Sequence, residues 1–385
     1  MEKMKKRILI VTEGYFPAEN YGGPPVSVRN LCNNLKDEFD FFIIAKAHDL
    51  NSKEKLSGIV EGWNTRDEAK VTYLSNDSFK SSSFNKIIKE VKPDLIYLQS
   101  FFSYTYVPQM LRISKKNDIK TLIAPRGELL EGAYRKKWKK LPYKNILKWL
   151  YIDEKVFFHA TSENEINSIK SAFGNKNTIL SFPNLPSGKF DKNIEKDVKK
   201  KDSGKLSLVF ISRIVPKKNL IYALEILREI KGDVIFDIFG PTEDKLYWEK
   251  CQKAIKELPP NIVVNYKGIL KNEEVKSRLS NYHFLLFPTL SENYGHVIVE
   301  AMLASCPVIL SDQTPWNKIV EYEGGFVFPL KNKSMFIEVV QNLVLIDDNV
   351  YKNIEKNNEK FILNEIISNE EIIHQKYLFR ELIKK

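Results

Sequence analysis

The chain has 385 residues, of which 43% are hydrophobic and 28% are charged, and Lys and Arg exceed Asp and Glu by 60 to 49. This composition is that of a folded soluble protein, and the length predicts two domains of fewer than about 200 residues each. No apolar run reaches the roughly 18 residues that cross a bilayer, and the net charge of +11 suits an anionic partner unless it only marks a solvated Lys-rich surface.

The N-terminal segment and the cysteines predict a cytoplasmic protein. The basic residues within 1–7 precede an apolar run that is too short for a signal sequence, so this run is expected to form the first strand. Cys32, Cys251 and Cys306 are scattered and odd in number, which indicates neither a disulfide framework nor a zinc site.

In the first half, runs rich in Val, Ile, Leu and Phe alternate with amphipathic helical runs, which is typical of a parallel sheet covered by helices. Seven strands are predicted there, over residues 7–13, 40–46, 70–74, 94–100, 120–125, 155–161 and 177–184. Their almost unbroken apolar character predicts strands that are buried on both faces.

A polar, charged stretch bounded by Pro and Gly follows, and it predicts a linker over 186–204 between domains at 1–185 and 205–360. The alternation then restarts, with strands expected over 206–213, 234–240, 261–268, 283–288 and 307–312 and helices over 219–230, 243–257, 272–281 and 294–305. The tail beyond about 333 is helical, and residues 361–385 are expected to pack back on the first domain. The predicted fold class is α/β, with two Rossmann-like α/β/α domains facing each other across a cleft.

Two features near strand ends are suited to phosphate. Neither GxGxxG nor GxxxxGK[ST] occurs, but the loop "SRIVPKKN" after one strand carries Arg213 and Lys218. The helix that starts near Gly295 would present the backbone amides of Gly295, His296 and Val297 to an anion. Alternatively, the two cations are simply solvated.

Two carboxylates flank the same helix start. Glu292 precedes the helix, Glu300 lies within it, and seven residues separate them. Carboxylates accept hydrogen bonds from vicinal hydroxyls, so one acid can bind a hexose and the other a ribose. Alternatively, Glu292 is a loop charge and Glu300 pairs with a structural cation.

These residues together resemble a known family. The Glu292-x7-Glu300 pair after "LLFPTL", the "SRIVPKKN" loop about 80 residues upstream and "PVILSD" after the helix resemble retaining glycosyltransferases of family 4, also called group 1, which have the GT-B fold. "PRGE" at 125–128 and "SENYGHVIVEA" at 291–301 resemble the branch that assembles capsule, O-antigen and exopolysaccharide.

The resemblance implies transfer of a hexose or N-acetylhexosamine, with retention, from a nucleotide diphosphate sugar to a glycan acceptor on a polyprenyl-diphosphate lipid. A UDP- or GDP-sugar is the expected donor substrate, and no cofactor is expected. No Asp-x-Asp occurs, so no metal is expected. A nucleotide-sugar 2-epimerase of the same fold and a non-catalytic nucleotide-sugar-binding subunit remain as alternatives.

The resemblance also implies roles for individual residues. Arg213 and Lys218 would hold the diphosphate, Glu292 the transferred sugar and Glu300 the ribose. The full expected donor-binding set is Gly22, Gly23, Arg213, Lys218, Gly240, Gly268, Ile269, Leu270, Glu292, Asn293, Tyr294, Gly295, His296, Val297 and Glu300.

The expected catalytic residues are Glu292, Arg213, Lys218, Arg126 and His159. Many relatives carry an active-site histidine where this chain has Arg126, which is therefore expected to contact the donor phosphate or the acceptor. His159 ends a predicted strand, and a lone histidine there is either a catalytic or a structural residue.

A segment over 133–155 interleaves basic residues with Trp and Tyr. Such a segment suits the headgroup layer of an anionic membrane, so the protein is expected to be cytoplasmic, with a peripheral position on the inner face of the cell membrane. A solvated helix whose aromatic residues enter the core is the alternative. No nucleic-acid-binding motif is recognised, and no nucleic-acid partner is expected.

Overall fold

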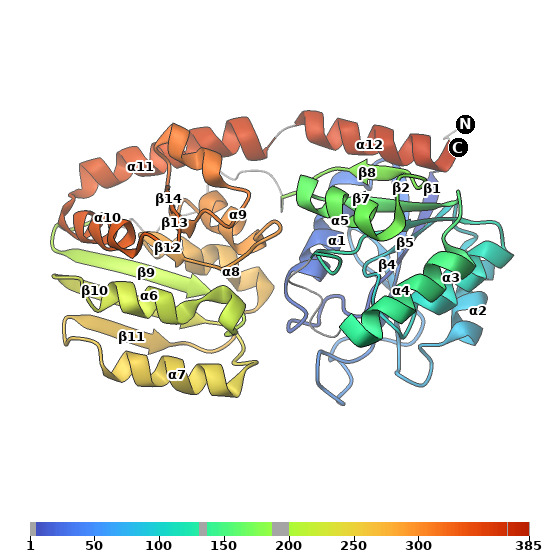
Figure 1. Ribbon diagram of the computed structural model, residues 1–385, viewed down its shortest axis with the longest axis horizontal. Coiled ribbons are helices and arrows are strands. Elements are labelled where there is room, and N and C mark those ends of the chain that lie inside the picture. The colour runs from blue at the N-terminus through green and yellow to red at the C-terminus, as the bar shows by residue number, and fades with distance from the viewer. Residues whose placement is uncertain (1–4, 131–136, 187–199, 368, 385) are drawn as a thin grey trace. The chain divides into compact units, whose positions relative to one another are not determined.

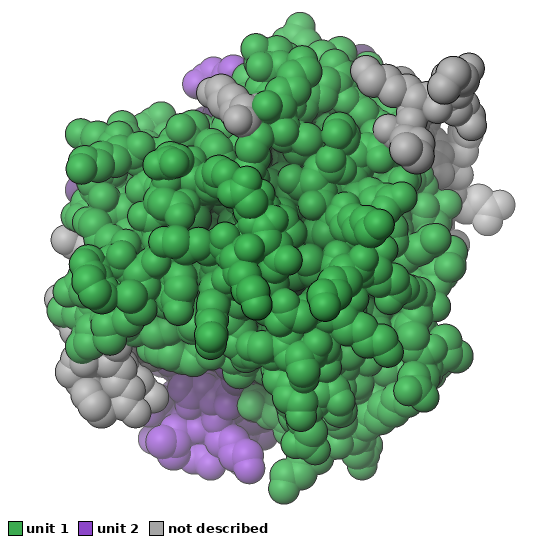
Figure 2. All heavy atoms as spheres, turned by 90° about the vertical axis from the view of Figure 1, so that its right-hand side faces the viewer, with its two compact units in different colours: residues 1–188, 369–385 green, residues 189–368 purple. Residues whose placement is uncertain are grey.

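The computed structural model describes residues 5–130, 137–186, 200–367 and 369–384. The chain divides into two compact units, which Figure 2 colours separately. Unit 1 comprises Met1–Gly188 and Asn369–Lys385, and unit 2 comprises Lys189–Ser368. Most of the predicted linker, residues 187–199, lies outside the described residues.

Unit 1 is built on an eight-stranded sheet with the order β3-β4-β2-β1-β5-β6-β7-β8. All neighbouring strands are parallel except β3 and β4, which are antiparallel. The strands are β1 (Lys6–Val11), β2 (Phe39–Lys46), β3 (Trp63–Thr65), β4 (Lys70–Leu74), β5 (Leu95–Leu98), β6 (Lys120–Ile123), β7 (Val156–Ala160) and β8 (Ile179–Ser181).

Helices connect most of the parallel strands (Figure 1). The connecting helices are α1 (Gly23–Leu35), α2 (Ser81–Val91), α3 (Val107–Lys116), α4 (Lys137–Tyr151) and α5 (Glu163–Phe173), and α12 (Asn369–Lys384), from the far end of the chain, belongs to the same unit. Local chemistry sets some of their starts. The Ser162 side chain caps α5 by accepting from the backbone N–H of Glu165, and α1 has prolines in its first turn.

Unit 2 is built on a six-stranded sheet in which all neighbours are parallel, with the order β11-β10-β9-β12-β13-β14. The strands are β9 (Lys205–Ile211), β10 (Asp233–Phe239), β11 (Ile262–Tyr266), β12 (Phe284–Phe287), β13 (Val308–Ser311) and β14 (Phe326–Phe328). The helices are α6 (Leu220–Leu227), α7 (Lys245–Lys256), α8 (Asn272–Leu279), α9 (His296–Leu303), α10 (Lys333–Leu345) and α11 (Asp348–Phe361).

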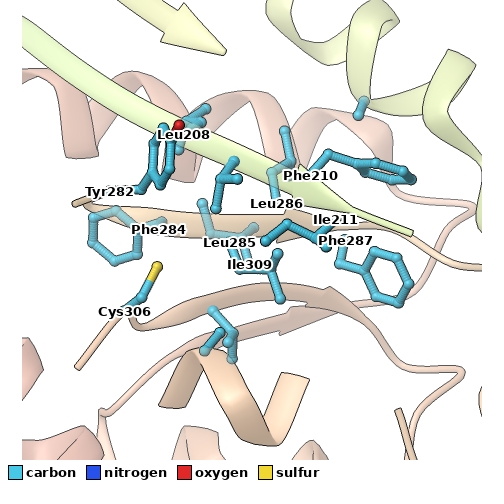
Figure 3. Close-up of a cluster of buried hydrophobic side chains, with 14 of the residues drawn as sticks. Leu208, Phe210, Ile211, Tyr282, Phe284, Leu285, Leu286, Phe287, Cys306 and Ile309 are labelled. Carbon is cyan, nitrogen blue, oxygen red and sulfur yellow. The ribbon is translucent and has the colours of Figure 1, made fainter. Parts of the chain in front are cut away.

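The core of unit 2 lies on both faces of its central strands. Every residue of β12 and of β13 is buried. Figure 3 shows Leu208 and Phe210 of β9 beside Phe284 and Phe287 of β12 in this core. Burial on both faces is the reason that these strands read as continuous apolar runs, because neither face of the strand meets water.

The two parallel sheets confirm the predicted fold class, two Rossmann-like α/β domains. Sequence patterns missed two short strands, β3 and β14, which have three residues each. The predicted helix over 294–305 is shorter than expected and runs from His296 to Leu303. Gly295 before it and Ser305 after it both have positive φ, which stops the helix at either end. Among the described helices, none has the length and apolarity that crossing a membrane requires.

Helix α12 is attached to unit 1 by an aromatic cluster. Phe379 is fully buried, and its ring centroid lies 6.0 Å from that of Phe39, 6.0 Å from that of Tyr97 and 5.7 Å from that of Phe182. Rings at such distances and tilted angles attract each other in addition to burying apolar area.

Replacing Phe379 by Ala is therefore expected to destabilise unit 1 by about 3–5 kcal/mol, since it leaves a cavity among three rings. The measurement is denaturant unfolding combined with hydrogen exchange of unit 1 peptides. Tyr377→Ala is the matched control, because Tyr377 lies on the same helix and is 54% exposed. Equal losses in the two variants would contradict this account of how α12 is held.

Candidate functional site

The strand order of unit 2 reverses at one point. The chain starts in β9 and extends the sheet to one side through β10 and β11, and then returns to the other side of β9 with β12, β13 and β14. The loops that leave β9 and β12 at their carboxyl ends therefore lead toward opposite sides of the sheet. Open α/β sheets bind ligands where two such neighbouring loops start. Residues 212–219 and 288–295 form these two loops.

Backbone and side-chain hydrogen bonds join the two loops. The Lys217 carbonyl oxygen accepts from the Leu290 N–H at 2.9 Å and from the Thr289 hydroxyl at 3.2 Å. The Asn219 amide donates to the Pro288 carbonyl at 2.9 Å. The side chains on both loops are therefore held in a common frame.

Lys218 and Glu292 form an ion pair across this frame. Their side chains are only 14% and 12% exposed, so the pair is largely shielded from water. The Lys218 ammonium also lies 5.5 Å from the centre of the Phe287 ring. The pairing fixes the direction of the Glu292 carboxylate, because a shielded charge is costly to separate from its partner.

Lys217 belongs to the same group of cations. Burial lowers the pKa of its ammonium, the nearby Lys218 and Arg213 lower it further, and the Glu292 carboxylate acts in the opposite direction. Three cations thus lie near the single carboxylate of Glu292. A bound anion would reduce the repulsion between them.

Arg213 pairs with an acid that the sequence pattern did not indicate. Its Nη1 donates to Glu243 Oε2 at 2.9 Å, with the side chains 40% and 37% exposed. A pair exposed to this degree contributes at most about 1 kcal/mol, so a phosphate group can replace the carboxylate.

The start of α9 lies beside Glu292. Gly295 has φ +74, and a Cβ added there would lie 2.7 Å from Ile298 Cδ1 and 3.6 Å from Glu292 Cγ. The left-handed φ and the close approach both favour glycine here, and they bring the start of α9 next to Glu292.

Five of the predicted residues lie in or beside this helix. Tyr294 is buried between Trp316 and His296, with ring centroids 5.1 and 4.8 Å away, and the Trp316 indole donates to its carbonyl. Burial raises the pKa of the Tyr294 hydroxyl and the Glu300 carboxylate raises it further, so Glu300 lies near this ring. Val297 packs against the core of unit 2, and Asn293 is half-buried.

The loops after β10 and β11 meet the loop after β9. The Gly240 N–H donates to the Gly268 carbonyl at 2.8 Å, and a Cβ on Gly240 would lie 1.8 Å from the Ser212 carbonyl oxygen. Gly240 therefore touches the residue before Arg213. Ile269 is 50% exposed, and Leu270 packs against the core.

Four of the predicted site residues belong to unit 1. Gly22, with φ +70, caps α1, and Gly23 is its first residue. The loop before them is tied to Asp49, which accepts from the backbone N–H of Asn20 at 3.1 Å and from its amide at 2.9 Å. Arg126 has φ +53 and donates to Gln99 and Asn184.

His159 lies in the core of unit 1, and its contacts are those of a structural residue. It is 2% exposed, its Nε2 lies 2.9 Å from the Phe182 carbonyl oxygen, and its Nδ1 lies 2.5 Å from the Tyr97 hydroxyl. A carbonyl only accepts, so Nε2 carries the hydrogen and the Tyr97 hydroxyl donates to Nδ1. Both ring nitrogens are thus engaged within the fold, which leaves neither for a substrate.

A family model matches a large part of unit 2. Residues 191–361, less than half of the chain, match the family model described as glycosyl transferases group 1. The resemblance inferred from the Glu292-x7-Glu300 pair and the "SRIVPKKN" loop is thereby confirmed.

Two curated proteins are similar to this chain. It is 29% identical to the poly(glycerol-phosphate) alpha-glucosyltransferase of Bacillus subtilis over 44% of this chain, but it spans only 24% of that protein's length. It is 24% identical to the capsular polysaccharide biosynthesis glycosyltransferase CapM of Staphylococcus aureus, over 57% of this chain and 61% of that one.

A solved structure shows the same fold over nearly the whole length. Anabaena HepE, in complex with UDP and glucose, superposes with a TM-score of 0.70 at 14% identity, covering 98% of this chain and 99% of that chain. The likeness shows that the two units together have the GT-B fold.

The buried imidazole of His159 is expected to make the free energy of unfolding depend on pH. Burial, and secondarily Arg126, hold the pKa of His159 well below its usual value. The unfolded chain takes up a proton here below about pH 6.5 while the folded chain does not. The contribution of neutral His159 to the free energy of unfolding is therefore fully present above about pH 6.5. It is lost as the pH falls below this value, by at most about 1.4 kcal/mol per pH unit.

The unfolding free energy of His159→Gln is thus expected to depend less on pH between 6.5 and 5 than that of the wild-type enzyme. His374→Gln is the matched control, because it removes an exposed imidazole from the same unit. A folded-state imidazole NMR signal that shows His159 protonated at pH 6 would contradict the prediction.

Proposed function

We propose that this glycosyltransferase moves a hexose or N-acetylhexosamine, with retention and without a metal ion, from a nucleotide diphosphate sugar to a glycan acceptor. The observation that carries the proposal is the group of Arg213, Lys217 and Lys218 with Glu292 at the point where the strand order of unit 2 reverses. Cations held beside a carboxylate suit a ligand that has both phosphates and hydroxyls.

In this proposal the donor binds along unit 2. Arg213, Lys218 and the first amides of α9 hold the diphosphate, Glu292 accepts from hydroxyls of the transferred sugar, and Glu300 accepts from the ribose. The remaining positions line the donor, with residues 268–270 against the base. The lining residues on unit 2 are Gly240, Asn293, Tyr294, His296 and Val297.

The cations also serve the chemical step. The bond between the anomeric carbon and the phosphate oxygen breaks, and negative charge grows on the leaving diphosphate, where Arg213 and Lys218 stabilise it more than in the ground state. The acceptor hydroxyl forms the new bond on the same face of the sugar, and its proton passes to the leaving phosphate oxygen. This front-face path needs no protein base, in keeping with the buried position of His159.

The relatives support a donor and an acceptor class. The similar structure contains UDP and glucose, which favours a UDP-hexose as the first donor to test. The curated relatives are named for glucosylation of poly(glycerol-phosphate) and for capsular polysaccharide biosynthesis. We accordingly propose a surface polymer as the product and a lipid-linked glycan as the acceptor.

Donor binding is tested by thermal unfolding with UDP, GDP, ADP and CDP and their common sugars. A ligand at about 100 times its dissociation constant should stabilise the fold by roughly 2.7 kcal/mol. The shift is expected with one base and should be lost in Arg213→Ala and in Glu300→Ala. Arg228→Ala is the matched control, because Arg228 also pairs with an exposed acid of unit 2, Glu257.

A donor–acceptor assay followed by NMR of the product then separates transfer from 2-epimerisation and reports the anomeric configuration. An inverted linkage, a free epimer or the absence of any nucleotide shift would contradict the proposed function.

Helix α4 carries the proposed membrane contact. Trp149 is 85% exposed, Ile146 is 55% exposed and Leu141 is 41% exposed, and Lys144 and Lys148 lie on the same helix. Its other face holds it to unit 1. Leu147 is buried there, and the ring of Tyr143 packs against Phe101 and Phe102. Residues 131–136 lie outside the described residues, so the proposal rests on the remainder of the segment.

We expect Trp149→Glu and Ile146→Glu to weaken binding to vesicles of phosphatidylglycerol and phosphatidylcholine at least tenfold, because each puts a negative charge on the apolar face. Vesicle co-sedimentation at low and high salt is the measurement. Ile373→Glu is the control, since Ile373 is 64% exposed on α12 of the same unit. Equal effects of all three substitutions, or no wild-type binding, would contradict the membrane role.

A further inference from the structure

Arg126 of unit 1 carries a charge that no acid pairs with in the described part of the chain. Its Nε and Nη2 donate to Gln99 Oε1 at 3.1 and 2.7 Å, and its Nη1 donates to Asn184 Oδ1 at 2.5 Å. Both acceptors are uncharged amide oxygens. Three other arginines pair with carboxylates, namely Arg213 with Glu243, Arg228 with Glu257 and Arg380 with Glu38.

The guanidinium of Arg126 still has donors to offer. A guanidinium has five N–H groups, of which these contacts use one on each nitrogen. One N–H is therefore left on each terminal nitrogen. Two donors on neighbouring nitrogens are what a phosphate or carboxylate group takes in a bidentate pair.

Glu165 approaches the same loop without neutralising Arg126. It is 2% exposed, and its Oε1 accepts from the Gly127 N–H. Its Oε2 accepts from the N–H and the hydroxyl of Thr161, both at 2.8 Å. The carboxylate is thus occupied in holding backbone, and it forms no ion pair with Arg126 among the contacts of the described residues.

Backbone and buried side chains hold Arg126 in place. Its φ of +53 is followed by a φ of +77 at Gly127, so two successive residues are left-handed. A bulky residue in this conformation costs free energy, and such residues are concentrated at functional sites. Gln99 is 5% exposed, and its Oε1 accepts from both Nε and Nη2 of Arg126. A cation that is already positioned loses little conformational freedom on binding.

The position of Arg126 in the sheet also suits a ligand. The strand order of unit 1 reverses between β1 and β5, just as that of unit 2 reverses between β9 and β12. Gln99 directly follows β5, and Arg126 follows β6, the neighbour of β5. Arg126 therefore stands near the carboxyl ends of the strands beside the reversal, where open sheets bind ligands.

We propose that Arg126 binds a phosphate or carboxylate group of the acceptor, so that unit 1 selects an anionic acceptor substrate. This inference rests on the proposed function, because a transferase needs a second substrate site besides that of the donor. The cations of unit 2 serve the donor diphosphate, whereas Arg126 is on the other unit and is held by neutral groups.

The test measures binding of small probes to the full chain while it is saturated with the nucleoside diphosphate that binds best. The anionic probes are sn-glycerol 3-phosphate and glucuronate, and glycerol and glucose are their uncharged counterparts. The variants are Arg126→Gln and Arg126→Lys, with Arg112→Gln as the control. Arg112 is an exposed arginine on α3 of the same unit, so the control removes an equal charge. Circular dichroism and thermal unfolding verify that each variant is folded.

Wild type and Arg112→Gln are expected to bind at least one anionic probe more tightly than its uncharged counterpart. Arg126→Gln should bind that probe at least tenfold more weakly, and Arg126→Lys, which keeps the charge but not the fork, should lie between them. Equal binding by wild type and Arg126→Gln, or no binding of either anionic probe, would overturn the inference.

Two further outcomes separate this inference from the proposed function. Loss of nucleoside diphosphate binding in Arg126→Gln would overturn the inference by assigning Arg126 to the donor, while the transferase proposal would stand. Failure of every nucleoside diphosphate to bind the wild-type chain would overturn the proposed function, and the acceptor assignment with it.

Discussion

The parallel pairing of strands is the constraint on which the candidate sites of both units depend. A parallel neighbour is reached only by crossing over the sheet, so all carboxyl ends lie along one edge and all helices lie on the faces. In unit 2 the chain begins in the middle of the sheet, at β9, and later returns beside it as β12. The loops after these two strands are far apart in sequence, yet they share hydrogen bonds such as that from the Leu290 N–H to the Lys217 carbonyl.

The charges on these loops are arranged differently from those of ordinary surface pairs. Lys218 and Glu292 are shielded from water and hold each other, which orients the carboxylate before any ligand arrives. Arg213 and Glu243 are more exposed, so their pairing is weak and exchangeable. Glu292 can therefore stay in place to accept from hydroxyls, while Arg213 can leave Glu243 to bind a phosphate. Burial lowers the pKa of Lys217, and the nearby Lys218 and Arg213 lower it further against the opposing effect of Glu292.

In unit 1, buried polar residues hold both His159 and Arg126. The Tyr97 hydroxyl contacts His159, and Gln99, two residues after Tyr97, accepts from the Arg126 guanidinium. The histidine that the sequence pattern offered as a catalytic candidate thus has its nitrogens committed inside the fold. The Arg126 side chain, in contrast, is partly exposed, so its guanidinium can meet a ligand. An arginine supported in this way can select a charged group without taking part in proton transfer.

The amino-acid sequence by itself determined the fold class and most of the strands, because a strand that is buried on both faces has to be apolar at every position. It also indicated Glu292, Glu300 and Gly295, since their spacing and the glycine requirement are local properties of a loop and a helix. Short strands such as β3 escaped it, because three residues carry too little periodicity. The partners of the charged residues were decided only by the tertiary structure. Glu243 meets Arg213 across 30 positions and Tyr97 meets His159 across 62, and contacts at such separations depend on strand order and register, which no local pattern encodes.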